Sequence, residues 1–257
     1  GYELKQGLAS RGVDTQFLID TPERVTPTYT KPMMRNSNGA ERELNRLDIK
    51  NRTPTPEPLQ DRVISQLRKA ASRFDGIIVA DQIEEPDFGV VTSRVREMLS
   101  DLSDECRGKV YFVDSRAHIG EFRGMILKPN RREAIRAVHP GWEGEIDREI
   151  VEQAGIRLRQ RSGKPVYLTM SEDGILLFTE NGRVRIPALP VAGEIDPVGA
   201  GDSTTAGIVS SLCAGARWEE AAVVGNLVAS ITVQQIGTTG VASREQLLAR
   251  FGETVRH

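Results

Sequence analysis

The chain has 257 residues, and its 34 basic and 36 acidic side chains leave a net charge of -2. This balance gives no electrostatic reason to expect a nucleic acid or a membrane surface as partner. The two cysteines, Cys106 and Cys213, are too few and too far apart for a disulfide framework or a zinc site, and Cys213 is expected to pack within an apolar helix. No apolar run approaches the roughly 18 residues of a spanning helix and no signal peptide is visible, so we expect a cytoplasmic protein.

The first fifty residues predict a short helix and a small sheet. Leu4 and Leu8 lie at helical spacing before Gly12, a residue favoured just beyond a helix C-terminus. The expected strands cover residues 15–20, 26–31 and 43–49. The loop R-N-S-N-G-A at 35–40 is a hairpin signal. Because polar residues alternate along these stretches, the sheet should keep one face in water, as a small insert over about 15–50.

From residue 55 onward, short apolar runs alternate with stretches of helical spacing. The apolar runs predict strands at 76–81, 109–114, 125–130 and 165–170. The helical stretches are expected at about 58–73, 90–99, 131–138 and 143–161. The rest of the chain predicts a hairpin at 175–178 and 182–188 and helices at about 200–214 and 218–234. This alternation indicates one α/β domain with a parallel sheet covered on both faces.

Polar residues stand at the ends of these predicted strands. Ligands of open parallel sheets bind beyond the carboxyl ends of the strands. Four residues fall there: Asp81, Asp114, Asn130 and Thr169. The sequence therefore predicts a binding site at this edge of the sheet.

The stretch G-A-G-D at 199–202 stands directly before a helix of small residues. Backbone amides at a helix start attract anions, and here they could stabilise a transferring phosphoryl group. Asp202 could then accept the proton of an attacking hydroxyl. An aspartate after a glycine turn is equally able to serve as a helix N-cap, and the four residues alone leave both possibilities open.

The residues around this stretch resemble a known family. From Asp196 to Gly207 the chain reads D-P-V-G-A-G-D-S-T-T-A-G, which is similar to the D-T-x-G-A-G-D signature of the ribokinase-like (PfkB) carbohydrate kinases. The resemblance implies a three-layer αβα sandwich with a mostly parallel central sheet and a small β lid, formed by residues 1–257 as one kinase domain. It implies Asp202 as catalytic base and the amides of Gly199, Ala200 and Gly201 as the anion hole. Pro197 replaces the usual threonine.

Further matches imply where ATP and Mg²⁺ bind. Asn130 and Glu133 match the family's N-x-x-E, which positions the magnesium and its waters; a helix start with glutamate at its third position is the alternative. L-T-M-S-E-D-G at 168–174 resembles T-x-G-x-x-G, so that Thr169, Ser171 and Gly174 would line the nucleotide phosphates and ribose. Ser171 stands in place of the middle glycine. The alternative is simply a strand end that leads into a hairpin.

Two more positions complete the implied nucleotide side. Asn226 corresponds to a family asparagine near the adenine, although a helix asparagine that faces water would fit equally well. Asp196 and Gly237 are candidates for the monovalent cation, such as K⁺, that family members often bind.

Several stretches are similar to the kinase domain of bacterial ADP-heptose synthesis enzymes, which implies O1 of a heptose 7-phosphate or a related sugar phosphate as acceptor. These stretches are T-P-T-Y-T-K-P-M, L-N-R-L-D-I, V-D-S-R with a later F-R-G-M-I-L-K-P-N, S-E-D-G and I-G-T-T-G-V-A-S-R-E-Q-L. Lys31, Arg35 and Arg46 on the lid could bind the sugar phosphate, or be solvated charges on a wet sheet. Asp81 would lie at the sugar, but Q-I-E-E follows it where the subfamily has an aromatic residue and K-G.

Other functions remain open from the sequence. A kinase for another sugar or a nucleoside would share these motifs, and so would a non-catalytic regulator that binds a nucleotide or a sugar. The family's first strand and G-G-N motif, which contact the sugar, have no counterpart here, so we expect an incomplete sugar site. Lids of this kind often pair in the family, which makes a homodimer possible.

Overall fold

The computed structural model describes residues 1–36, 39 and 41–254, and the chain divides into two compact units. The first unit consists of residues 1–70 and 85–95, and the second of residues 71–84 and those from 96 onward. Each unit is described by itself.

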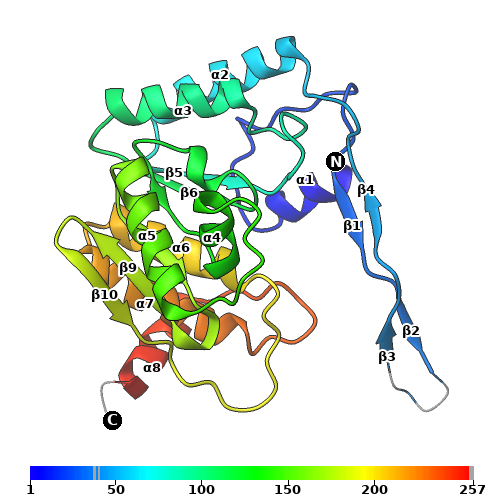
Figure 1. Ribbon diagram of the computed structural model, residues 1–257. Coiled ribbons are helices and arrows are strands. Elements are labelled where there is room, and N and C mark those ends of the chain that lie inside the picture. The colour runs from blue at the N-terminus through cyan, green and yellow to red at the C-terminus, as the bar shows by residue number, and fades with distance from the viewer. Residues whose placement is uncertain (37–38, 40, 255–257) are drawn as a thin grey trace. The chain divides into compact units, whose positions relative to one another are not determined.

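The first unit contains two helices and two short antiparallel ribbons (Figure 1). Helices α1 (Tyr2–Ala9) and α2 (Glu57–Ala71) flank the strands in the chain. Strand β1 (Thr28–Thr30) pairs with β4 (Leu47–Ile49), and β2 (Met33–Arg35) pairs with β3 (Glu41–Glu43). The pairing of the predicted strands at 26–31 and 43–49 is confirmed. The predicted hairpin loop at 35–40 includes residues 37, 38 and 40, which lie outside the described residues.

Two expectations for this region are wrong. Residues 15–20 form turns instead of a strand, because the Asp14 carboxylate accepts the amide of Gln16 at 2.9 Å and the Leu18 amide donates to the carbonyl of Thr15. The strands do not have one wet and one buried face, because every strand residue whose burial is described is exposed except the half-buried Asp48. A two-stranded ribbon has no second layer of its own to cover a face.

The second unit is built on a sheet of six strands in the order β10-β9-β8-β7-β6-β5. The strands are β5 (Gly76–Asp81), β6 (Val110–Ser115), β7 (Ile126–Leu127), β8 (Val166–Thr169), β9 (Ile175–Thr179) and β10 (Gly182–Ile186). Strands β5 to β8 run parallel, and β9 and β10 are antiparallel to their neighbours. The predicted strand at 125–130 is shorter than expected because Pro129 has no N–H to donate. Pairing resumes beyond the proline in a single bridge between Asn130 and Thr169.

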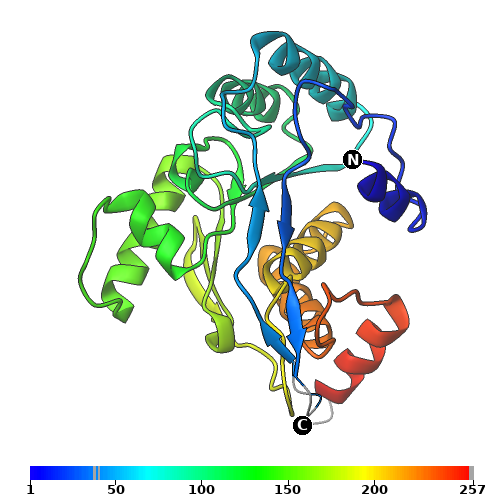
Figure 2. The same cartoon turned by 90° about the vertical axis from the view of Figure 1, so that its right-hand side faces the viewer.

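Helices cover both faces of this sheet (Figure 2). They are α4 (Arg131–Val138), α5 (Arg148–Ser162), α6 (Ala200–Cys213) and α7 (Trp218–Thr232). Helix α8 (Arg244–Thr254) packs against α7. The chain also forms helix α3 (Ser93–Glu105) and short 3-10 turns at η1 (Ile119–Glu121) and η2 (Ser171–Asp173). Helices α4 and α5 contact β7, β8 and β9 from one side, and α6 and α7 contact β5, β6, β9 and β10 from the other. The expected three-layer αβα sandwich with a mostly parallel sheet is therefore confirmed.

Capping residues explain where several helices begin. Helix α5 starts at Arg148 and not at 143, because Asp147 accepts the amide of Ile150 at 2.9 Å. Helix α3 starts at Ser93, whose amide and hydroxyl both donate to Asp87 at 2.6 Å. The sequence prediction does not include α8. None of the described residues of this helix is buried, so it lacks the buried apolar face by which other helices are predicted.

The core follows the alternation of side chains along the strands. Phe112, Ile126, Tyr167 and Leu177 pack with residues of α6 and α7 in one buried cluster. Their neighbours along the strands point to the opposite face, where Phe178 meets α5 at Gly155. This parity decides which face each polar residue at a strand end can reach.

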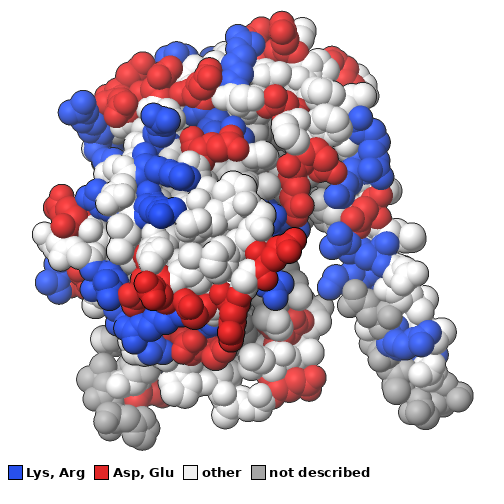
Figure 3. Space-filling model, in the orientation of Figure 1, with Lys and Arg blue, Asp and Glu red and all other residues white. Residues whose placement is uncertain are grey.

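Charged side chains are interspersed by sign on the face shown in Figure 3. Over the described residues, none of the helices combines the length and the apolar character that a membrane crossing requires.

The contact between α5 and β9 gives a stability prediction. A Cβ built on Gly155 would lie 2.1 Å from Cε2 of the buried Phe178 ring. Gly155→Ala should therefore lower the free energy of unfolding by about 1–3 kcal/mol, measured by urea denaturation. Gly252→Ala in α8 is the matched control, since nothing lies within 4 Å of that position and alanine there should stabilise the helix by up to about 1 kcal/mol. Equal effects of the two substitutions would contradict this packing.

Candidate active site

The turn before α6 depends on a glycine at position 199. Gly199 is the N-cap of α6 and has a φ of 80°, in the left-handed region that other residues avoid. A Cβ at this position would also lie 2.6 Å from Cγ2 of Thr239. The loop after α7 therefore packs directly against the G-A-G turn, and any side chain at 199 would separate the two.

The amides of this turn present a positive helix end. The sequence predicts free amides at Gly199, Ala200 and Gly201. The Ala200 amide is not free, because it donates to the carbonyl of Pro197 at 3.1 Å. Within the described part of the chain, the amides of Gly199, Gly201 and Asp202 have no hydrogen-bond partner. Unpartnered N–H groups at a helix start form a site for an anion such as a phosphoryl group.

Asp202 stands at the same helix end with an unused carboxylate. It is the third residue of α6, it is exposed, and no other described residue gives it a hydrogen bond or an ion pair. The alternative that Asp202 caps the helix is wrong, because Gly199 occupies the N-cap and α6 has no side-chain cap bond. A carboxylate without a protein partner beside free amides can accept a proton from a bound hydroxyl.

Asp196 joins the turn to the loop that follows α7. One of its carboxylate oxygens accepts the Gly237 amide at 2.9 Å, and the other accepts the Val198 amide at 3.0 Å. Its own amide donates to the carbonyl of Val233 at 2.7 Å. The structure thus brings the two predicted cation-site residues, Asp196 and Gly237, into direct contact, with Asp196 as the anchor of both segments.

Asn130 and Glu133 form a capping box at the start of α4. The Asn130 side chain accepts the Glu133 amide at 2.9 Å, and the Glu133 carboxylate accepts the Asn130 amide at 2.8 Å. Burial raises the pKa of Glu133, and the charge of Asp114 raises it further. The helix-start alternative is therefore realised, although one carboxylate oxygen of Glu133 remains for a ligand or its water.

The segment from Thr169 to Gly174 makes a tight turn at the end of β8. Thr169 donates its amide to the carbonyl of Pro129 at 2.9 Å and so lies beside Asn130. A Cβ on Gly174, whose φ is 88°, would approach the Ile186 carbonyl oxygen to 2.2 Å. Ser171 has a φ of 55°, so the serine occupies a backbone conformation that suits the glycine of the family motif.

Asn226 is buried in α7 and does not face water, so that alternative is wrong. Its amide nitrogen donates to the carbonyl of Pro187 at 2.9 Å and to that of Ile186 at 3.3 Å. The strand end at 186–188 therefore contacts both Gly174 and Asn226. Contact of Asn226 with an adenine stays a prediction.

An ion pair at the strand ends includes a residue that the sequence analysis missed. Lys128 Nζ lies 2.8 Å from Asp114 Oδ2, and the lysine is only 4% exposed. A lysine directly after the apolar run M-I-L, opposite an aspartate at the end of the neighbouring predicted strand, is the signal that could have found it.

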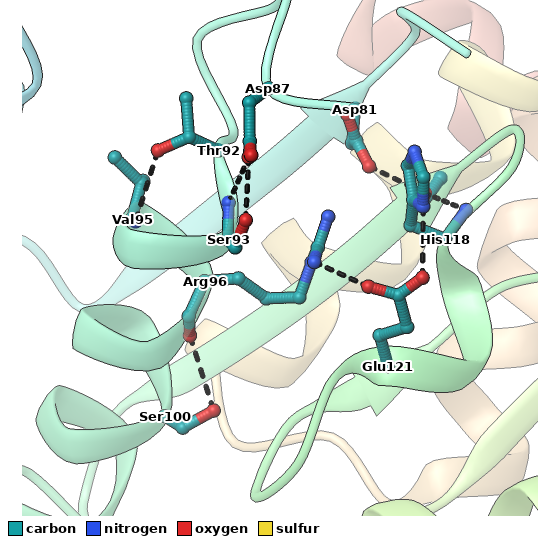
Figure 4. A network of polar contacts seen from close by, with 10 residues as sticks. Asp81, Asp87, Thr92, Ser93, Val95, Arg96, Ser100, His118 and Glu121 are labelled. Atoms are coloured by element: carbon teal, nitrogen blue, oxygen red, sulfur yellow. Dashed lines mark hydrogen bonds and ion pairs between the residues drawn. The ribbon is translucent and has the colours of Figure 1, made fainter. Parts of the chain in front are cut away.

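Asp81 lies at the carboxyl end of β5 within a connected set of polar contacts (Figure 4). It is 3% exposed and accepts a hydrogen bond from the Ser115 hydroxyl at 2.7 Å, which in turn accepts the His118 amide at 3.0 Å. Glu121 pairs with the His118 ring and with Arg96. Burial raises the pKa of Asp81, and the Ser115 hydrogen bond opposes that effect. Contact of Asp81 with a sugar stays a prediction.

The three cations assigned to the sugar phosphate belong to the first unit. Arg46 binds Asp48 through two nitrogens at 2.6 and 2.8 Å and lies over the ring of Tyr29. Lys31 and Arg35 are exposed. The structure therefore leaves the contact of Lys31, Arg35 and Arg46 with a substrate as a prediction.

Comparison with known proteins places these features in context. Residues 1–245 match the family described as pfkB family carbohydrate kinase. The chain is 30% identical over 255 residues to the "Bifunctional protein HldE" of Geotalea uraniireducens (strain Rf4), covering 98% of this chain and 49% of that protein. The protein of the same name from Bradyrhizobium sp. (strain ORS 278) is 28% identical over 247 residues, with 95% and 48% covered. The chain thus spans about half the length of the curated relatives it matches.

Solved structures agree on the fold. Ribokinase from Thermotoga maritima superposes with a TM-score of 0.68 at 20% identity, covering 97% of this chain and 76% of that one. Phosphofructokinase-2 from Escherichia coli in complex with potassium has a TM-score of 0.68 at 17% identity, covering 99% and 78%. The fold is therefore ribokinase-like.

The backbone at Ser171 gives a second stability prediction. A left-handed conformation costs a serine roughly 1–2 kcal/mol that a glycine avoids, while glycine loses some of this through unfolded-state entropy. Ser171→Gly should leave the free energy of unfolding unchanged or raise it by up to about 1 kcal/mol. Glu172→Gly, at a neighbour without positive φ, should lower it by about 0.5–1 kcal/mol. Chemical denaturation of both variants measures the difference, and a Ser171→Gly variant as unstable as Glu172→Gly would refute the strain.

Asp81 gives a prediction on pH. Because its pKa is raised in the folded state, the folded protein binds this proton more tightly than the unfolded chain does. The contribution of Asp81 to stability is present below its ordinary pKa of 3.8 and is lost as pH rises through the raised value. Asp81→Asn should therefore be more stable than the unmodified protein at pH 7, with a difference that shrinks toward pH 4 in urea titrations. A difference that stays constant with pH would show that the carboxylate is not desolvated.

Proposed function

Since this chain belongs to the pfkB family of carbohydrate kinases, we propose that it transfers the γ-phosphate of ATP to a hydroxyl group of a sugar. The observation that carries this proposal is the start of α6, where the unpartnered Asp202 carboxylate stands beside unpartnered backbone amides. A protein that only binds a phosphate has no use for an acid at that position, because a carboxylate repels the anion. A kinase needs both groups.

Each group at the helix start has a role in the proposed reaction. The amides of Gly199, Gly201 and Asp202 stabilise negative charge on the γ-phosphoryl oxygens as the group moves. Asp202 accepts the proton of the acceptor hydroxyl, whose oxygen then attacks phosphorus in line with the leaving oxygen of ADP. Ala200 contributes through its bond to Pro197, which fixes the turn.

The nucleotide would lie across the loops that meet at this turn. Thr169, Ser171 and Gly174 would contact its phosphates and ribose, and Asn226 would hold the strand end beside its base. Mg²⁺ would neutralise charge on the phosphates. Among the described residues no cluster of three or more His, Cys, Asp or Glu could cage a metal, which fits an ion held mainly by phosphates and waters near Asn130 and Glu133. Asp196 and the loop at Gly237 are the proposed place for a monovalent cation.

The acceptor proposed is O1 of a heptose 7-phosphate or a related sugar phosphate. The support is the similarity of several stretches to the kinase domain of ADP-heptose synthesis enzymes. Lys31, Arg35 and Arg46 would supply charge to the sugar phosphate, and Asp81 would lie on the sugar side. The segment Q-I-E-E after Asp81 departs from that subfamily. Phosphorylation of a different sugar would therefore revise the choice of acceptor and leave the kinase assignment in place.

The proposal also covers the domain organisation and the oligomeric state of the protein. Residues 1–257 would act as one kinase domain with a lid over about 15–50, and two lids would pair in a homodimer. The proposed location is the cytoplasm, where ATP is available to the reaction.

Phosphoryl transfer from radiolabelled ATP to heptose 7-phosphate, fructose 6-phosphate, ribose and a nucleoside tests the proposal. Asp202→Asn should lower kcat by about 10²–10⁴-fold while the affinity for ATP changes little. Glu219→Gln is the matched control, because Glu219 is also an exposed acid in the first turn of a neighbouring helix.

Two results would contradict the proposal. If the protein binds ATP but phosphorylates none of these acceptors, it is a binding protein and not a kinase. If Asp202→Asn retains activity within tenfold of Glu219→Gln, Asp202 is not the base.

A further inference from the structure

Lys128 and Asp114 extend from the face of the sheet that α6 covers. Ile126 and Phe112 pack under α6 and α7, and side chains alternate along a strand, so the residues two positions later return to the same face. Lys128 and Asp114 are those residues. The pair therefore lies at the carboxyl ends of β6 and β7, on the side where α6 begins.

The burial of this pair calls for an explanation. Lys128 is 4% exposed, and the side chain of Asp114 is 14% exposed. Two charges removed from water rarely add net stability over apolar residues of similar volume. A lysine nitrogen has three hydrogens to donate, and among the described residues the only partner of Lys128 Nζ is the ion-paired carboxylate of Asp114. The other N–H groups are available to a ligand.

The ammonium of Lys128 points to the helix start. A Cβ built on Gly201 would lie 3.5 Å from Lys128 Nζ, and apart from the adjoining residues of its own helix no other described heavy atom would lie within 4 Å of it. The space over Gly201 is therefore open and is bordered by the lysine nitrogen. The amides of Gly201 and Asp202, which have no hydrogen-bond partner among the described residues, belong to this same first turn of α6.

We propose that Lys128 is a further catalytic residue whose ammonium contacts the transferring phosphoryl group, and that Asp114 is the positioning residue that holds it there. This inference rests on the proposed function. The bond from phosphorus to the ADP oxygen breaks, the bond to the sugar oxygen forms, and the hydroxyl proton goes to Asp202. Lys128 exchanges no proton; it stabilises the charge on the phosphoryl oxygens.

Three variants separate a catalytic role from a structural one. Lys128→Met should lower kcat by about 10²–10³-fold and leave KM for the sugar within about threefold. Because Asp114 is then buried without its partner, the double variant Asp114→Asn with Lys128→Met keeps the test valid if the single variant unfolds. Asp114→Asn alone retains the ammonium and should lose less than tenfold in kcat.

Lys109→Met provides the matched control. Lys109 lies just before β6, at the opposite end of that strand, and its ammonium binds a protein acceptor, the carbonyl of Phe74. This variant should keep the unmodified kcat. Calorimetric titration adds a readout that does not require turnover: Lys128→Met should reduce the preference for MgATP over MgADP by at least about tenfold, whereas Lys109→Met should not.

The outcomes distinguish this inference from the proposed function. A folded double variant with kcat within threefold of Lys109→Met would overturn the role of Lys128 and leave the kinase assignment intact. If the unmodified protein transfers no phosphate, the proposed function fails. If Lys128→Met then shows the same preference for MgATP over MgADP as the unmodified protein, the contact of Lys128 with the phosphate is refuted as well.

Discussion

The candidate site depends on one backbone turn, the left-handed conformation of Gly199 against Thr239. This turn lets α6 begin with free amides and puts Asp202 on its first turn with an unused carboxylate. A helix that begins with a side-chain cap would have used these amides and left nothing for a phosphate. In the proposed function, the absence of a side-chain cap on α6 leaves these amides for the phosphoryl group, while the helix forgoes the stability that such a cap supplies.

The register of the sheet places the polar residues at the strand ends on two opposite faces. Asp114 and Lys128 lie on the α6 face, while Asp81 and Ser115 pair one residue out of phase and point to the other face. Asp81 is the last residue of β5 and accepts a hydroxyl, whereas Asp114 is the penultimate residue of β6 and pairs with a lysine. The step of one residue between their register positions puts the two side chains on opposite faces of the sheet.

The sequence predicts the architecture well where apolar periodicity is strong. The strands from β5 to β10 and the helices α4 to α7 follow from short apolar runs and helical spacing, and the motifs at Asp196–Asp202 and Asn130–Glu133 lie where the pattern puts them. The prediction fails where the decisive interaction is local and polar, as at Gln16, where an aspartate turn replaces a strand. It also misses Lys128, because the burial of a charge depends on a partner from another strand.

Asp196 closes a ring of covalent chain and hydrogen bonds, from its carboxylate through Gly237, back along the loop to Val233, and from there to its own amide. The circumference of such a ring is fixed. One residue inserted between Val233 and Gly237 would add up to about 3.5 Å of chain to this ring, and one inserted between Asp196 and Gly199 would displace the turn from Thr239 by a similar length. Displacements near 1 Å already cost catalysis heavily. An insertion in the connection before Asp196 would leave both this ring and the contact of Gly199 with Thr239 unchanged.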